Sequence, residues 1–336
     1  MPVFFSGASK RHFLQVLAVA AMAVVAPASH AQLPAGLAGE TLKIVVGYAA
    51  GGAADTVARL YAEQLRGAGF AAVVVENKPG ASARLAWHQV RQSKPDGLTL
   101  FLVPSPLLTI MPMTYKSPGY DAEKDLTAVA TVVEIPTAIV TGKEQPYSDL
   151  KQYVAWAKSH PGKASLGLAT IGSAGHLGAF ALASQQQFEL LPVAYKGAAP
   201  MLIDVASGQL SMGWDALASM MPLYKGGRIK FLGLSGNKRL PVLPDVATAK
   251  EQGFNEFEPA TSWYGIYAPA GTASHRLDAL EKAFMMAAAQ PGLQRSLEAA
   301  GFVAYSEGRA ATTARAQRER QQWAPIIQAS GISIAD

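Results

Sequence analysis

The 336-residue sequence contains no cysteine. Without a thiol the chain forms no disulfide, has no cysteine nucleophile and has no amino-terminal cysteine that could carry a lipid. Patterns typical of metal sites are missing as well, because no H-E-x-x-H segment occurs and the histidines have no paired spacing suited to a metal ion. The sequence therefore predicts a protein without metal or other cofactor.

Charge is sparse and nearly balanced. Only 16% of the residues are charged, with 29 lysines and arginines against 24 aspartates and glutamates. Loss of Lys10 and Arg11 with an amino-terminal signal would leave 27 against 24, an excess too mild to indicate a nucleic-acid partner. No apolar run after residue 31 is long enough for a transmembrane helix. We therefore expect neither nucleic acid as a partner nor a membrane span.

The first 31 residues have the pattern of a secretory signal peptide. A basic start at Lys10 and Arg11 is followed by the apolar run Phe13–Val25, which is too short to span a bilayer comfortably. Small residues at Ser29 and Ala31 stand at the positions that determine cleavage. We expect cleavage after Ala31 and a soluble, exported product; the alternative is a retained membrane anchor.

The stretch Leu42–Arg59 changes its hydrophobic period at a pair of glycines. A β-branched apolar run typical of a buried parallel strand precedes Gly51 and Gly52, and a helical pattern begins at Ala53. The glycines leave no side chain over the turn, so the first helical N–H groups are open to an anion. The turn has neither a Walker nor a dinucleotide fingerprint. Asp55, in the first helical turn, is interpreted either as part of this site or as a helix cap.

Strand and helix patterns alternate along the rest of the chain, which predicts parallel sheets covered by helices. A mature chain of about three hundred residues favours two domains. The apolar run Leu126–Thr141 is interpreted as strands that cross from one domain to the other. The loops at the carboxyl ends of parallel strands should lie side by side as a binding edge.

A series of short motifs then identifies a family resemblance. In order, they are GGAAD at Gly51, ENKPGA at Glu76, KPDGLTLFL at Lys94, YDAEKDL at Tyr120, GSAGHL at Gly172, AYKGAAPML at Ala194, SGQL at Ser207, LPDVATAKEQG at Leu243 and SWYGIYAPAG at Ser262. The series resembles the Bug family of periplasmic solute-binding receptors, which serve tripartite tricarboxylate transporters. The resemblance implies an α/β, two-lobed fold like that of type II periplasmic binding proteins, with a ligand cleft between the lobes.

The resemblance also implies a domain plan and a site. Lobe 1 would comprise residues 40–127 and 256–336, and lobe 2 residues 128–255. Such receptors hold a carboxylate mainly with backbone amides, and on this chain the matching positions in lobe 1 are Tyr48, Gly51, Gly52, Asp55, Gly80, Ala81, Ser82, Arg84 and Ser105. Those in lobe 2 are Thr170, Gly172, Ser173, His176, Tyr195, Lys196, Gly197 and Asp215.

Two departures from the family pattern stand out. Ala49 and Ala50 replace prolines, which predicts a less rigid first loop, and Arg84 stands where the family has a small residue. We hypothesise that Arg84 pairs with an anionic ligand; the alternative is a solvated arginine on the second helix. Trp263 is interpreted as core near the hinge. The arginines of the carboxyl-terminal helix are interpreted as a solvated face or, alternatively, as a membrane-partner surface; they are Arg309, Arg315, Arg318 and Arg320.

The sequence thus favours a monomeric, non-enzymatic periplasmic receptor for a small organic anion that delivers its ligand to membrane transporter subunits. One alternative is a sensor that reports the same ligand to a membrane kinase. The other is a periplasmic hydrolase with a dispersed triad. Ser173 is no nucleophile elbow, because Ile171 stands where that motif has glycine.

Overall fold

A computed structural model describes residues 1–3, 37–48, 50–67, 69–168, 173–195 and 198–334. By its contacts the chain divides into two units, residues 1–32 and 33–336. The predicted signal peptide lies almost entirely outside the described residues. No helix among the residues searched is long and apolar enough to cross a membrane.

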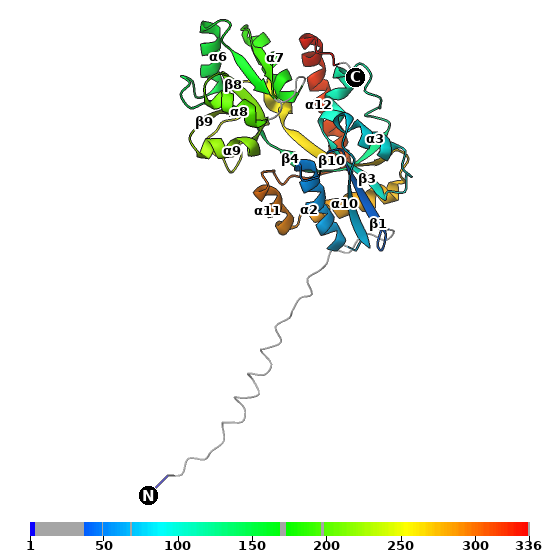
Figure 1. Ribbon diagram of the computed structural model, residues 1–336. Helices are drawn as coiled ribbons and strands as arrows, with labels where there is room; N and C mark the ends of the chain where they lie inside the picture. The colour runs from blue at the N-terminus through cyan, green and yellow to red at the C-terminus, as the bar shows by residue number, and fades with distance from the viewer. Residues whose placement is uncertain (4–36, 49, 68, 169–172, 196–197, 335–336) are drawn as a thin grey trace. The chain divides into compact units, whose positions relative to one another are not determined.

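The first lobe is built on a six-stranded mixed sheet with the order β11-β4-β10-β3-β1-β2 (Figure 1). Leu42, Ile44 and Val46 of β1 face one core and Val45 faces another, which explains the continuous apolar run. The strands are β1 Thr41–Val46, β2 Ala72–Asn77, β3 Thr99–Pro104, β4 Leu126–Ile135, β10 Ser262–Pro269 and β11 Glu307–Gly308. The helices of this lobe are α2 Ala53–Gly67, α3 Arg84–Arg91, α4 Pro106–Thr109, α5 Met111–Thr114, α10 Ser274–Ala288 and α11 Pro291–Ala299, with the 3₁₀ turn η1 Ala81–Ala83.

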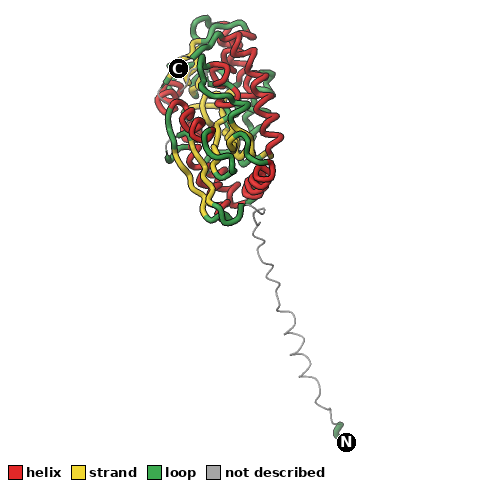
Figure 2. The backbone as a smooth tube through the Cα atoms, turned by 90° about the vertical axis from the view of Figure 1, so that its right-hand side faces the viewer, coloured by secondary structure: helices red, strands yellow, loops and turns green. Residues whose placement is uncertain are grey.

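The second lobe is built on a five-stranded mixed sheet with the order β7-β6-β8-β5-β9. Helices α6 and α7 pack on one face and α8 and α9 on the other, so helices flank the strands (Figure 2). The strands are β5 Thr137–Gly142, β6 Ser165–Leu168, β7 Leu191–Ala194, β8 Met212–Ala216 and β9 Ile229–Leu234. The helices are α6 Leu150–Ser159, α7 Ala174–Gln186, α8 Ala198–Ala206 and α9 Leu217–Lys225, with the 3₁₀ turn η2 Asn255–Ala260.

The chain changes sheets at Pro136 and again at Thr261. Strand β4 pairs with β10 along its whole length, so the predicted boundary after residue 127 falls inside a strand of the first sheet. Phe257 and Ala260 of η2 pack in a core of the second lobe, so the predicted boundary at residue 256 also comes too early. The first boundary was misplaced because the apolar pattern of a buried strand is the same in either sheet. The second was misplaced because η2 is a 3₁₀ turn whose packing partners lie far away in the sequence.

Helix α12, Arg309–Ser330, joins the two lobes. Ala316 lies in a core of the first lobe, whereas Trp323 and Ile327 lie in a core of the second. The expected assignment of this whole helix to the first lobe is therefore corrected, because its last turns pack beside α7. Figure 1 shows α12 in red beside the crossing strand β10.

Candidate functional site

The first loop is shaped by the carboxylate of Asp55. Its side chain is 4% exposed and accepts hydrogen bonds from the Gly51 N–H at 2.8 Å and from Arg59 Nε at 2.9 Å. A third bond comes from Asn77 Nδ2 at 3.0 Å. The Arg59 bond, with those from Gly51 and Asn77, holds the pKa of Asp55 below its usual value. These contacts match the capping interpretation of Asp55: the carboxylate serves its own loop, where Gly51 has a φ of 83°.

Asn77 is the functional residue that the sequence interpretation missed. Its side-chain amide also donates to the Tyr48 carbonyl at 3.0 Å, so one side chain fixes two points of the first loop. Asn77 stands opposite Val46 in the parallel pairing of β1 and β2. The polar residue at the carboxyl end of a predicted strand was a partial signal, because it lies beside this loop only once the pairing of β1 and β2 is known.

We predict that Asp55→Asn lowers the free energy of unfolding by about 1.5–3 kcal/mol, because a neutral amide replaces the acceptor of charge-assisted bonds. A carboxyl whose pKa is lowered by folding contributes stability above its unfolded pKa, near 3.9, and that contribution disappears as pH falls through the folded value. The gap between wild type and variant should therefore shrink from pH 6 toward pH 3.

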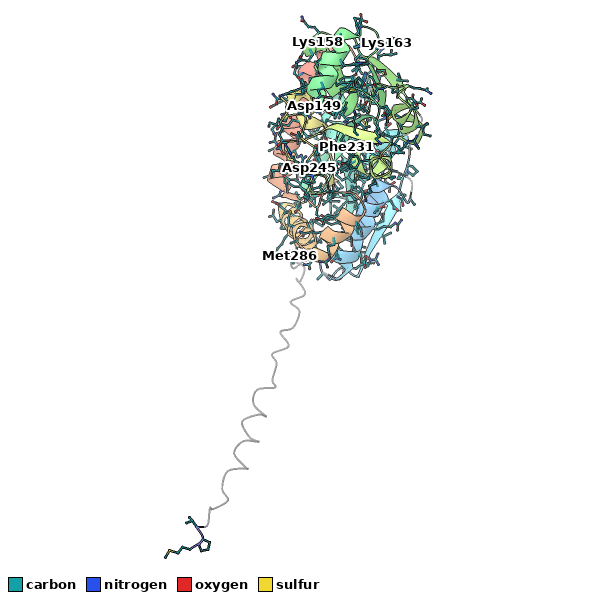
Figure 3. The ribbon with its side chains drawn as sticks, turned by 90° about the vertical axis from the view of Figure 1, so that its left-hand side faces the viewer. Asp149, Lys158, Lys163, Phe231, Asp245 and Met286 are labelled. Atoms are coloured by element: carbon teal, nitrogen blue, oxygen red, sulfur yellow. The ribbon has the colours of Figure 1, made fainter. Side chains whose placement is uncertain are left out.

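Urea unfolding at several pH values measures this gap. The matched control is Asp245→Asn, since Asp245 is an exposed aspartate of the second lobe, labelled in Figure 3. A gap that stays constant down to pH 3 would show that the Asp55 charge does not stabilise the loop.

The second loop contains an uncommon run of backbone conformations. Gly80 has a φ of 134°, and it is followed by Ala81, Ser82 and Ala83 with φ values of 46°, 53° and 71°. A residue with a Cβ loses roughly 1–2 kcal/mol in this left-handed region. Strain of this kind is found where the surrounding structure enforces it, often at ligand sites. Successive N–H groups of a left-handed turn point the same way, which favours an anion at this turn.

The two loops meet at the end of β1. A Cβ added at Gly47 would lie 2.2 Å from the Cβ of Ala83, so the chain leaving β1 passes directly beside the second loop. Tyr48 follows and is 40% exposed. Burial of its surroundings nevertheless raises the pKa of Tyr48, and the nearby Tyr115 phenol adds to the rise.

Arg84 is folded back onto the second loop. Its Nε donates to the Ala81 carbonyl at 3.1 Å, and its guanidinium carbon lies 4.7 Å from the centre of the Tyr115 ring. The residue is half-buried and stands at the start of α3, where its guanidinium contacts the protein as well as solvent. Direct pairing of Arg84 with a ligand stays a prediction.

Ser105 ties the first site to the crossing strand β10. It is 4% exposed, its N–H donates to the Trp263 carbonyl at 2.9 Å, and its hydroxyl accepts from the Trp263 N–H at 3.2 Å. These bonds hold the end of β3 in place. Trp263 is fully buried, as expected for a core residue near the hinge.

The second lobe presents its predicted residues less directly. Ser173 caps α7 by accepting from the His176 N–H at 3.3 Å, and burial lowers the pKa of His176. The Tyr195 hydroxyl donates to Asp204 Oδ2 at 2.5 Å, and burial together with that carboxylate raises the pKa of Tyr195 to about 12. Its hydroxyl is therefore engaged by α8. The remaining predicted residues of this loop set, Thr170, Gly172, Lys196 and Gly197, lie outside the described residues.

Asp215 serves the start of α9. Its Oδ1 accepts from the Ala216 N–H at 2.6 Å and from the Ser219 hydroxyl at 3.2 Å. Burial raises its pKa, with both hydrogen bonds acting in the opposite direction. These partners all belong to its own lobe. A bond from Asp215 to amides or water of the opposite lobe, or to an amino group on the ligand, stays a prediction.

The arginines of α12 do not form an open basic face. Arg309 pairs with Asp278 at 2.5 Å and Arg320 with Glu123 at 2.8 Å, while Arg315 is buried. Three of the four predicted candidates for a partner surface are therefore engaged within the chain.

A cavity of about 500 Å³ lies beside this helix at the crossover, between Glu134 and the loop around Lys238, and not at the loops predicted to bind ligand.

The site therefore offers backbone amides at the start of α2 and in the left-handed turn, beside the partly exposed ring of Tyr48. Among the residues searched, no group of three or more histidines, cysteines, aspartates or glutamates could hold a metal ion. Such a surface suits recognition of a carboxylate by hydrogen bonds.

Comparison with known proteins gives a consistent result. Residues 57–332 match the model of the tripartite tricarboxylate transporter family receptor. The periplasmic binding protein BugD is 31% identical, with a TM-score of 0.68 over 88% of this chain and 99% of BugD. Rpa4515 of R. palustris, solved with adipate, is 26% identical, with a TM-score of 0.73 over 88% and 98%. MatC from Rhodopseudomonas palustris, solved with bound malate, is 28% identical, with a TM-score of 0.67 over 86% and 99%.

Proposed function

The chain belongs to the tripartite tricarboxylate transporter family of receptors, and from this premise we propose that it is a periplasmic receptor for a small carboxylate. The ligand is held between the two lobes and delivered to the membrane subunits of a tripartite transporter. Two similar receptors, solved with adipate and with malate, support a dicarboxylate of this size as the ligand class. Delivery of a ligand to the transporter from the periplasm requires that the receptor be exported, and the first 31 residues have the pattern of a secretory signal.

The observation that carries this proposal is the left-handed turn from Gly80 to Ala83 beside the first loop. Its N–H groups and those at the start of α2 are donors that need no basic side chain. A hydrogen bond to a charged group contributes about 1.5–3 kcal/mol, and a micromolar ligand requires about 8 kcal/mol net. A few such bonds to one carboxylate, with packing of the ligand body on Tyr48, reach that value.

We propose further that the receptor catalyses no reaction. Three of the predicted hydroxyl and acidic side chains are engaged in structural bonds: Ser105 with Trp263, Tyr195 with Asp204, and Asp55 with Gly51. A nucleophile requires a neighbouring base that can take its proton. The Ser105 hydroxyl accepts a bond from a backbone N–H, and the Tyr195 hydroxyl, which does reach a carboxylate, has its pKa raised to about 12 and so keeps its proton at neutral pH. Binding and release are the function that this arrangement supports.

A thermal-shift screen tests the ligand class. The mature protein is unfolded, freed of bound ligand and refolded, then heated with malate, adipate and related carboxylates, with adipamide and sugars as controls. A ligand at a hundred times its Kd adds about 2.7 kcal/mol of stability, which raises the Tm measurably. We expect shifts with carboxylates and none with adipamide, because the amide has no charge for the turn to hold. Equal shifts with adipate and adipamide would refute carboxylate recognition.

A further inference from the structure

The left-handed turn of the second loop needs something to hold it. Ala81 and Ser82 are both exposed, so packing of their side chains does not enforce their positive φ values. Only the third residue, Ala83, is buried, against the glycine at position 47. An exposed alanine and an exposed serine would relax to ordinary conformations unless other bonds fixed the backbone.

Arg84 supplies such bonds at the end of the turn. The Ala81 carbonyl accepts from the backbone N–H of Arg84 and also from its side-chain Nε at 3.1 Å. The backbone N–H and the side-chain Nε of Arg84 thus both bond the carbonyl at the start of the left-handed run. Two bonds to one carbonyl close the turn from both sides.

The guanidinium is in turn anchored by Tyr115. It lies 4.7 Å above the ring centre, within the range of a cation–π interaction. The backbone of Tyr115 is itself fixed, since its N–H donates to Met111 at 3.1 Å and it forms a bridge with Ile334. The turn is thereby connected through Arg84 to a rigid segment after α5.

We propose that Arg84 is a positioning residue, which holds Gly80–Ala83 in the left-handed conformation so that its amides are prearranged for a carboxylate. Its effect on affinity rests on the proposed function, but its effect on the turn does not. The inference replaces the hypothesis of a direct ion pair with the ligand. If Arg84 positions the turn, its loss lowers affinity because the backbone at Ala81 and Ser82 relaxes. If Arg84 pairs with the ligand, its loss lowers affinity because that ion pair is missing.

Glycine at position 82 provides the discriminating variant. Glycine adopts positive φ without strain, so Ser82→Gly removes the strain at one of the two exposed positions and lets the turn form with less help from Arg84. We expect Arg84→Ala to weaken binding of malate or adipate about tenfold, the loss of one charge-assisted bond, and Arg84→Ala with Ser82→Gly to recover to within about threefold of wild type. Because Ser82 is exposed, the glycine removes no packing.

Tyr115 supplies a matched pair of variants. Tyr115→Phe keeps the ring beneath the guanidinium and should leave affinity within about twofold of wild type, whereas Tyr115→Leu should weaken binding about threefold to fivefold. Calorimetric titration of each variant measures these values. If Arg84→Ala weakens binding and glycine at position 82 fails to restore it, Arg84 contacts the ligand directly and the inference is wrong.

A second measurement needs no ligand. The backbone N–H of residue 84 donates to Ala81, so its hydrogen-exchange rate reports how often the turn opens. After correction for intrinsic rates, exchange should be about tenfold faster in Arg84→Ala and slower again with Ser82→Gly added. Unchanged exchange in Arg84→Ala overturns the inference. If neither malate nor adipate binds the wild type while exchange behaves as expected, the ligand class fails and the positioning role stands.

Discussion

Replacing Gly47 by alanine is expected to lower the affinity for a carboxylate at least about tenfold and the stability by about 1–3 kcal/mol. The added Cβ would lie 2.2 Å from the Ala83 Cβ and 2.8 Å from its Cα, so the backbone of the second loop would have to move. That loop is the left-handed turn whose amides we assign to the ligand. A methyl group at Gly47 therefore acts on the site without touching the ligand.

The measurement is calorimetric titration of Gly47→Ala with malate and adipate, together with urea unfolding. Gly292→Ala is the matched control, because a Cβ there meets nothing within 4 Å. Adding Ala83→Gly removes one of the two colliding methyl groups and should restore part of the affinity. Wild-type affinity in Gly47→Ala would mean that the second loop does not form the carboxylate site.

The sequence predicted the strands and loops of the site better than the contacts within it. The β1 strand, its glycine turn and the helix after it follow from local patterns, and the structure has them with small shifts at the ends. Gly80 was expected as a site residue of the first lobe, and it has the positive φ of 134° that favours glycine. Local chemistry of this kind is encoded by adjacent residues.

The missed features depend on distant residues. Asn77 bonds Tyr48 and Asp55 because β1 and β2 are neighbours, a pairing that no local pattern specifies. The positive φ of Ala81 and Ser82 contradicts their intrinsic preference. Residue propensity alone therefore does not predict this turn. The packing of α12 across both lobes was missed for the same reason.

Arg315→Met is expected to destabilise the protein by about 3–5 kcal/mol at neutral pH, because it leaves the buried carboxylate of Glu319 without its cation. Arg315 is 8% exposed; its Nη2 lies 2.8 Å from Glu134 Oε1 and its Nε 3.0 Å from Glu319 Oε1. Trp263 donates to the same Glu319 carboxylate at 2.9 Å. The network therefore fixes both crossing strands, β4 and β10, to α12.

The loss should grow with pH. Burial raises the pKa of Glu319 and Arg315 opposes that rise, so without Arg315 the folded pKa increases further. A carboxyl whose pKa is raised by folding binds more protons in the folded state, and its stability contribution falls as pH rises from the unfolded value of about 4.3 through the folded value. The variant should thus lie closer to wild type at pH 5 than at pH 8 in urea unfolding.

A second substitution identifies the buried charge as the cause. Adding Glu319→Gln to Arg315→Met should recover most of the lost stability at pH 8, because the buried side chain at position 319, which is 8% exposed in the wild type, is then neutral. Glu134, with 24% exposure, can be solvated by water instead. Arg318→Met is the control, since Arg318 is exposed on the same helix. If the loss is equal at pH 5 and pH 8 and Glu319→Gln restores nothing, packing of Arg315 on Trp263, 5.3 Å away, stabilises the crossover and its charge does not.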